Sequence, residues 1–222
     1  MTDNPFVAPA SGGKPGGQPA GVAAMPVPGA VMPICIICLL LGLVGFLGAC
    51  AQGVLIPFQA SLETMVDQMP GGTMEQRVFQ RMNMDAQKLV LIPYIVLLVV
   101  NLFVGAALFI ASILGLQRKE GGRKLLSFAL VAAIFYGLLK IGVTIYGYLT
   151  TTSAMASSVD HYVGEAPVDK LQQLFQLTKM FAAIGVGVGC VMAVALIAFY
   201  VWARIYMNKP HVVEYFQQTK VA

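Results

Sequence analysis

Long apolar stretches, separated by polar segments, dominate the chain of 222 residues. Four of these stretches exceed the roughly 20 residues that an α-helix needs to cross about 30 Å of hydrocarbon. They cover residues 31–57, 89–116, 125–149 and 181–203. Lys140 is the one charged side chain inside them. None of the stretches shows the period-two alternation of a membrane β-strand, so the pattern predicts four transmembrane helices.

The composition agrees with a chain that lies largely in lipid. Hydrophobic residues make up 58% of the sequence and charged residues 11%, with a mean hydropathy of +0.77. Soluble globular domains carry about 25% charged residues, so this chain has too few charges for a surface that faces only water. We therefore expect an all-α, multi-pass integral membrane protein whose transmembrane domain covers residues 31–207.

The two long polar segments between the stretches, residues 58–88 and 150–180, also carry helical patterns. In the first, apolar side chains recur at helical spacing and lead into the next stretch: Val78, Met82, Ala86 and Leu89. In the second, Pro167 suits the first turn of a helix. A continuous helix over residues 73–116 would be about 66 Å long at about 1.5 Å per residue, twice what a membrane needs. We expect helical extensions beyond the outer membrane surface.

The two halves of the chain resemble each other. Asp67 lies 12 residues before Phe79 in the first long segment, and Asp160 lies 15 residues before Phe175 in the second. Each aspartate follows a valine, and each phenylalanine precedes a glutamine. Both halves have the same predicted membrane orientation, so they would form two parallel-repeat helical hairpins rather than an inverted pair.

Basic residues set the expected orientation, because cytoplasmic loops of membrane proteins carry an excess of Lys and Arg. The short segment between the second and third stretches holds four basic residues and one acidic one: Arg118, Lys119, Arg123 and Lys124 against Glu120. Both long segments carry more acidic than basic residues. We therefore expect extracytoplasmic loops and cytoplasmic termini, with a disordered Pro/Gly-rich tail over 1–30 and a C-terminal tail over 208–222. The net charge of +4 follows from this bias and does not indicate a nucleic-acid partner.

Residues 47–50 have the form that a bacterial lipoprotein signal peptidase cleaves, which would make Cys50 a lipidated N-terminus. A secretory signal begins with a short, positively charged segment, yet Lys14 is the only basic side chain in residues 1–30. The small residues of this region also recur four apart, as in a stripe where another helix approaches closely: Gly45, Ala49 and Gly53. We favour helix packing over lipidation of Cys50.

Cys35 and Cys38 have the spacing of a redox or metal-binding pair. Disulfide exchange needs accessible thiols, yet this pair is expected at the cytoplasmic end of the first helix, away from the oxidising side. A zinc site requires two further ligands, and no nearby histidine supplies them. We expect Cys35 and Cys38 to be packed side chains one helical turn apart, and we expect neither a cofactor nor a metal. A membrane thiol oxidoreductase that uses this pair is a third functional alternative, after the two given below.

Two polar side chains inside the apolar stretches are candidates for function. Lys140 lies 15 residues from Leu125, and Asn101 lies 15 residues from Leu116, so the two could share one depth in the bilayer. A charged side chain inside a membrane marks a pathway, a partner or a side chain that snorkels to the surface, and all three interpretations stay open. At the matching level the last helix carries a second small-residue stripe: Gly185, Gly189 and Ala193.

The sequence contains no catalytic motif, phosphate-binding loop or dinucleotide fingerprint, so we expect that the protein is not an enzyme. Abundant small-residue faces favour a structural subunit, scaffold or assembly factor of a membrane complex. Its partners would be membrane lipids and other membrane subunits or further copies of the chain. The alternative is a small transporter or channel with Lys140 and Asn101 in a polar interior.

Overall fold

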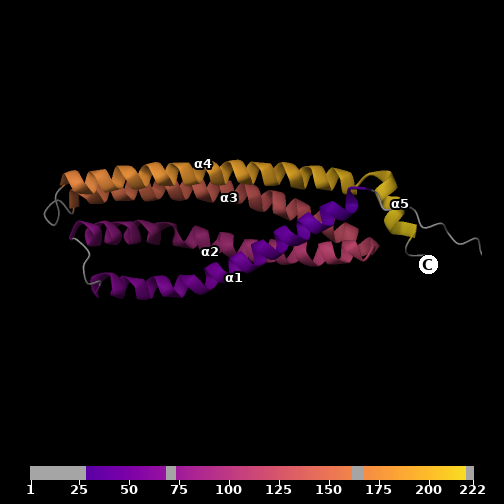
Figure 1. Cartoon of the computed structure of the whole chain (residues 1–222), viewed down its shortest axis with the longest axis horizontal. Coiled ribbons are helices and arrows are strands. Elements are labelled where there is room, and N and C mark those ends of the chain that lie inside the picture. The colour runs from indigo at the N-terminus through magenta and orange to yellow at the C-terminus, as the bar shows by residue number, and fades with distance from the viewer. Residues whose placement is uncertain (1–28, 69–73, 162–167, 219–222) are drawn as a thin grey trace, which may run out of the picture.

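The computed structural model describes residues 29–68, 74–161 and 168–218, and the regular structure in these ranges is helical. Four long helices run up and down in sequence order, and a short fifth helix follows (Figure 1). They are α1 (Val31–Gln68), α2 (Met74–Leu116), α3 (Glu120–His161), α4 (Val168–Met207) and α5 (Pro210–Gln218). Most of the predicted N-terminal tail lies outside the described residues.

All four long helices are long and apolar enough to cross a membrane. α2 has 43 residues, which corresponds to about 65 Å at about 1.5 Å per residue. The two long polar segments, residues 58–88 and 150–180, are largely helical, as predicted. α1 continues to Gln68 and α3 continues to His161. Residues 69–73 and Pro167, which was expected in the first turn of a helix, lie outside the described part of the chain.

Side-chain burial on α2 follows the predicted helical stripe with one shift. Val78, Met82 and Ala86 are buried, as expected, but Leu89 is 57% exposed. Val90 is buried in its place. Val90 lies four residues after Ala86 and continues the buried stripe, whereas Leu89, three residues after Ala86, lies outside the stripe. α1 and α3 are the helices that pack most extensively against α2.

Helices that are adjacent in sequence pack against each other along the bundle: α1 on α2, α2 on α3 and α3 on α4. α2 and α4 touch at few points. The order therefore places two hairpins, α1–α2 and α3–α4, side by side (Figure 1). Their origin as a repeat stays a prediction.

The main hydrophobic core lies at one end of the bundle, which we call the α5 end. Side chains of all five helices meet there. Fully buried members include Cys35 and Cys38 of α1, Ala111 of α2, Leu126 and Leu130 of α3, Met207 of α4, and Val212 and Phe216 of α5. The opposite end, where α1 and α3 finish and α2 and α4 begin, is called the far end below.

The turn between α2 and α3 closes this core. The backbone N–H of Lys119 donates to Leu114 O (3.2 Å), and that of Arg118 donates to Gly115 O (3.0 Å), the hydrogen-bond pattern of a Schellman motif. Arg118 takes the left-handed position of this motif with φ 57°, where glycine is usual. Its guanidinium lies 5.4 Å from the ring centre of Tyr215, so the turn is joined to α5.

Within the expected C-terminal tail, residues 208–222, nine residues form the short helix α5. The carbonyl of Lys209 accepts the first hydrogen bonds of this helix, from Val212 and Val213 at 3.0 Å. Pro210 follows at the first helical position, where its missing N–H costs nothing. A search for apolar stretches misses such a short helix, whose apolar residues occupy only one face.

Candidate functional site

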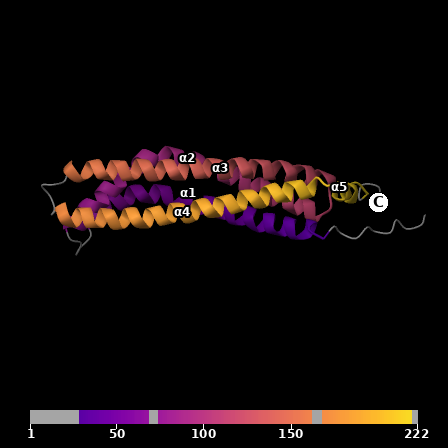
Figure 2. The ribbon, with the colours of Figure 1, turned by 90° about the horizontal axis from the view of Figure 1, so that it is seen from above.

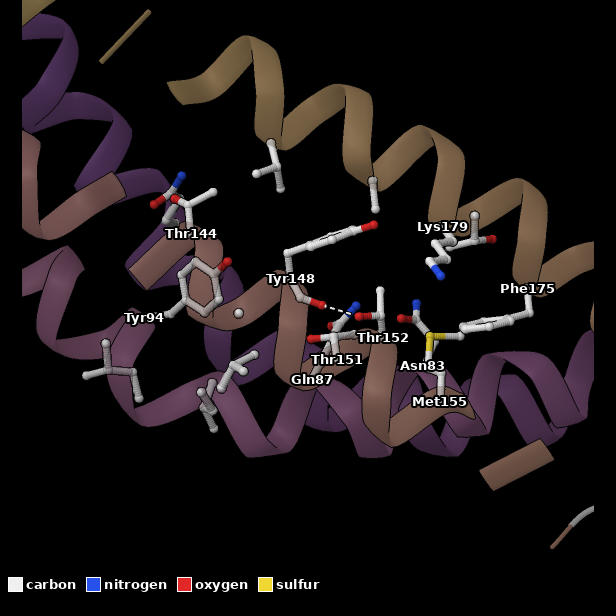
Figure 3. A pocket seen from close by; sticks show the side chains of 18 of the residues that line it. Asn83, Gln87, Tyr94, Thr144, Tyr148, Thr151, Thr152, Met155, Phe175 and Lys179 are labelled. Atoms are coloured by element: carbon white, nitrogen blue, oxygen red, sulfur yellow. Dashed lines mark hydrogen bonds between the residues drawn. The ribbon is translucent and has the colours of Figure 1, made fainter. Parts of the chain in front are cut away.

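A cavity of about 540 Å³ lies between α2, α3 and α4 toward the far end of the bundle (Figure 3). Among the residues of α1 whose side chains the structure describes, Gln52 alone lines it. Small-molecule sites in proteins typically have volumes of about 300–1,000 Å³. The cavity therefore has room for a ligand, and it is our candidate functional site.

In the view of Figure 2, α4 runs obliquely toward α3 as it approaches α5. The cavity lies on the far-end side of a close contact between these two helices. Near the middle of α3, on the α5 side of the cavity, an added Cβ at Gly137 would lie 2.8 Å from Ile197 of α4. Where the cavity begins on the α5 side, α4 presents the short side chains of Ala182 and Val186, which line the cavity without filling it.

Although Met155 of α3 and Phe175 of α4 also line it, the far-end part of the cavity wall is mainly polar. It carries amide and hydroxyl groups from three helices: Asn83 and Gln87 of α2, Tyr148, Thr151 and Thr152 of α3, and Thr178 of α4. Thr152 Oγ1 donates to the backbone carbonyls of Tyr148 (2.7 Å) and Leu149 (3.1 Å). The hydroxyl of Tyr148 is directed toward α4 (Figure 3).

Lys179 brings the only positive charge to this wall. Of the described residues that line the cavity, none other is charged. Its side chain extends from α4 toward Asn83 and Thr152 on the opposite side (Figure 3). No carboxylate among the described residues forms an ion pair with it, so the described part of the lining carries a net positive charge.

The other part of the cavity wall, nearer to α5, is mainly apolar, although Gln52 and Thr144 also line it. α2 lines it with Val90, Leu91, Ile95 and Leu98, and α4 with Ala182 and Val186. Tyr94 and Gly147 meet beside this part: a Cβ added to Gly147 would lie 2.9 Å from the Tyr94 hydroxyl oxygen. The absence of a side chain at Gly147 therefore lets the Tyr94 ring lie against α3. Along the helix axes the described lining thus changes from a mainly polar part that carries Lys179 to a mainly apolar part.

Comparison with family models, curated proteins and solved structures gives no match. The site must therefore be interpreted from its own chemistry. Among the described residues, no group of three His, Cys, Asp or Glu side chains lies close enough together to bind a metal ion.

A second hollow, of about 710 Å³, is lined by α4 alone. Its residues are Asp169, Gln172, Gln173, Gln176, Leu177 and Met180. No second element of the described chain forms an opposing wall, so this hollow belongs to the outer surface of α4.

Lys140 and Asn101, the predicted polar pair, have different surroundings in the structure. Asn101 Nδ2 donates to the carbonyl oxygen of Gly45 in α1 at 3.2 Å. Lys140 is exposed on α3, and no hydrogen bond joins it to Asn101. Neither residue lines the cavity. An exposed lysine in an apolar stretch fits the snorkelling interpretation.

The two small-residue stripes also differ in their surroundings. Positions 45 and 53 of α1 face α2, where an added Cβ would lie 3.5 Å from Asn101 Oδ1 and 3.9 Å from Leu98 Cδ2, respectively; Ala49 is buried. On α4, Ala193 is buried, but an added Cβ at Gly185 or Gly189 would meet nothing within 4 Å. The α1 stripe packs inside the bundle, whereas the two glycines of α4 are open.

The four cysteines are free thiols. Cys35 and Cys38 lie in the core, where an added Cβ at Gly115 would be 3.0 Å from Cys35 Sγ. Cys50 is exposed, and α1 continues through it without a break. The structure therefore gives the Cys35–Cys38 pair a packing environment.

Sequence reasoning missed the cavity, although its polar residues left two signals. Asn83 and Gln87 are four residues apart, so they share one face of α2. Thr150, Thr151, Thr152 and Ser153 follow one another on α3 just after an apolar stretch. Polar residues near the end of a span are common, however, and no pattern in the sequence indicates that these two groups face each other.

Replacing Asn101 by leucine should have a small effect on stability. Interhelical hydrogen bonds in membrane proteins contribute about 0.6 kcal/mol on average, and the substitution removes the one to Gly45. We expect the free energy of unfolding, measured by SDS titration of the detergent-solubilised protein, to fall by about this amount. A loss of several kcal/mol would contradict a role limited to this contact.

Proposed function

We propose that the protein is a non-enzymatic structural subunit of a membrane complex and that α4 contacts a partner helix. The observation that carries this proposal is the exposure of α4. Of its most apolar 18-residue stretch only 6% is buried, against 33% for α2. A helix that contributes so little to its own bundle has most of its surface available for another protein.

The proposal includes embedding of the four long helices in a membrane. Large apolar side chains are exposed on all of them, such as Phe103, Phe128, Phe135 and Val191, and soluble monomers rarely expose apolar patches of this extent. The α2–α3 turn and the segment after α4 are both basic and both lie at the α5 end. This end is therefore the cytoplasmic one, and the far end projects from the outer surface.

Aromatic residues support this placement of the cytoplasmic boundary. Trp202 and Tyr206 stack with ring centres 6.0 Å apart, and Tyr206 meets His211 of α5 edge to face. Trp and Tyr concentrate where a membrane meets water, so this group fits the boundary beside α5.

The open surface of α4 has the form of a helix-packing face. Gly185, Gly187 and Gly189 have open space around them, and exposed large side chains flank them: Phe181, Ile184, Val188, Val191 and Met192. Small residues between larger ones let two helix backbones approach closely in a membrane. The glutamine-rich hollow continues this face toward the start of α4, where a partner would form hydrogen bonds in water.

The transporter alternative has less support. It requires Lys140 and Asn101 in a shared polar interior, yet Lys140 is exposed and Asn101 bonds to α1. No observation in the described part of the chain links these residues into a pathway.

Leucine at both Gly185 and Gly189 should reduce the yield of co-purified partner at least tenfold, or about 1.4 kcal/mol, because the added side chains block close approach. The measurement is native mass spectrometry after extraction in mild detergent, where extra subunits or a second copy of the chain would appear.

Two matched variants serve as controls for this experiment. Gly142→Leu places the same bulk at another open position, on α3, and Lys140→Leu removes the charge that a transporter would need. Both should leave the partner yield unchanged. A monomeric wild-type chain, or a double α4 variant that keeps its partner, would overturn the proposal.

A further inference from the structure

We propose that the cavity between α2, α3 and α4 binds an anionic amphiphile. The charged head would lie beside Lys179, and the alkyl chain would lie against the apolar wall formed by Leu91, Ile95 and Leu98 of α2 and Val186 of α4. This inference rests on the proposed membrane embedding but not on the proposed partner of α4.

The position of the cavity suits a molecule that lies at a membrane surface. On α2 its lining extends over residues 83–98, across residue 89, where the apolar stretch begins. On α4 the lining extends over 175–186, across residue 181, where the apolar stretch begins. The polar part is thus level with the headgroup region, and the apolar part lies at the depth of the hydrocarbon.

The polar part of the cavity fits a head with one negative charge. Lys179 supplies one positive charge, and its side chain is directed across the cavity toward Asn83 and Thr152 (Figure 3). The Thr152 hydroxyl proton is already used by backbone carbonyls. The hydroxyl of Tyr148 and the amide groups of Asn83 and Gln87 remain as neutral donors, and charge-assisted hydrogen bonds to a carboxylate or phosphate oxygen are the strong ones.

The chemistry of the lining argues against other ligand classes. No carboxylate is among the described lining residues, so a metal ion or an organic cation would find no counter-charge. A nucleotide would bring several negative charges to a single lysine and a polar base to an apolar wall. A neutral lipid would fill the apolar part and leave Lys179 without a counter-ion.

The open arrangement of the helices provides a route into the cavity. α2 and α4 touch at few points, so the side of the cavity between them is not closed by helix packing. An amphiphile in the outer leaflet could therefore enter sideways, with its chain in lipid and its head in the interface throughout.

The test is native mass spectrometry of the full-length chain released from nanodiscs of phosphatidylcholine. One preparation contains 10 mol% phosphatidylglycerol, another contains 10 mol% oleate, and a third contains phosphatidylcholine alone. Lys179→Gln removes the charge of the cavity. Lys170→Gln is the matched control, because it makes the same change on the same helix at a residue that does not line the cavity.

We expect the wild-type chain to retain one anionic molecule and Lys179→Gln to retain at least tenfold less, with Lys170→Gln unchanged. Retention of oleate alone would identify a free fatty-acid type of ligand, and retention of phosphatidylglycerol would identify an anionic lipid headgroup. Ala182→Phe, which fills the apolar part, should reduce retention of both probes without a change in melting temperature.

Equal retention of phosphatidylcholine and the anionic probes, or equal retention by wild type and Lys179→Gln, would overturn the proposal. A negative result for ligand binding in the cavity can be distinguished from a negative result for the proposed function. Incorporation into nanodiscs tests embedding, and loss of a partner subunit on substitution of Gly185 and Gly189 tests the α4 face, whether or not the cavity holds a ligand.

Discussion

Replacing Gly105 by leucine is expected to separate α1 from α2 and to destabilise the whole bundle. Gly105 and Gly42 are buried where these helices cross. A Cβ at position 105 would lie 2.9 Å from Phe46 N and 3.1 Å from Gly42 O, and a Cβ at position 42 would lie 2.7 Å from Phe109 N. The obstructing atoms belong to backbone, which cannot rotate aside as the tip of a side chain can, so α1 as a whole must move.

The expected cost exceeds that of ordinary overpacking. Extra methylene groups in a packed core typically cost about 1–3 kcal/mol. Leucine at position 105 should cost more than about 3 kcal/mol, because separation of the helices also breaks the Asn101–Gly45 hydrogen bond and the packing around Ala49. SDS titration followed by circular dichroism would measure the loss in the free energy of unfolding.

Gly48→Leu is the matched control for this prediction. An added Cβ at Gly48 meets nothing within 4 Å, and the residue is exposed on the same helix. Its replacement should change the free energy of unfolding by no more than about 0.5 kcal/mol. If the two leucine variants were equally stable, the close crossing at Gly42 and Gly105 would not exist as described.

The helices could be predicted because each depends on a local pattern. Apolar runs longer than a membrane span, and helical spacing in the segments between them, were sufficient to place α1 to α4 and their extensions. The same approach missed α5, since its nine residues are too few for a span and its apolar residues occupy one face. The signals were Pro210 at the first helical position and the spacing of Val212, Tyr215 and Phe216.

Contacts between helices could not be predicted from the same patterns. Gly45–Ala49–Gly53 and Gly185–Gly189–Ala193 have identical spacing, yet the glycines of the first face α2 and those of the second face open space. The rotation of each helix about its axis decides this difference, and small residues suit either environment. The close crossing of α1 and α2 at Gly42 and Gly105 has no signal of its own in the sequence, because neither glycine is distinguished by spacing from the others.

The cavity was beyond sequence reasoning for a related reason. Its polar wall combines residues from α2, α3 and α4 that are far apart in the chain, so it exists only once three helices have their relative rotation and separation. Lys140 is a candidate from the sequence because it is the one charged residue inside an apolar stretch. Lys179 lies just before such a stretch, where a charged residue is not unusual. The structure directs Lys179, not Lys140, into a cavity.

Substitution of Phe216 by alanine is expected to release α5 from the bundle. Phe216 is fully buried, together with Val212 of the same helix, in the core shared with α1 and α4. Truncation of a buried phenylalanine to alanine typically costs about 3–5 kcal/mol. The cation–π contact between Arg118 and Tyr215 contributes only about 0.5–1 kcal/mol, so it cannot hold α5 in place once the phenylalanine packing is lost.

The readout for Phe216→Ala must separate local release from global unfolding. If α5 detaches before the rest of the bundle unfolds, the free energy of global unfolding falls by no more than the free energy that docking of α5 contributes. Proteolysis within the detached α5 becomes faster. Limited proteolysis should therefore cleave residues 210–218 much faster in this variant than in Glu214→Ala, which removes an exposed side chain of the same helix. Equal cleavage rates in the two variants would mean that the buried face of α5 does not hold the helix against the core.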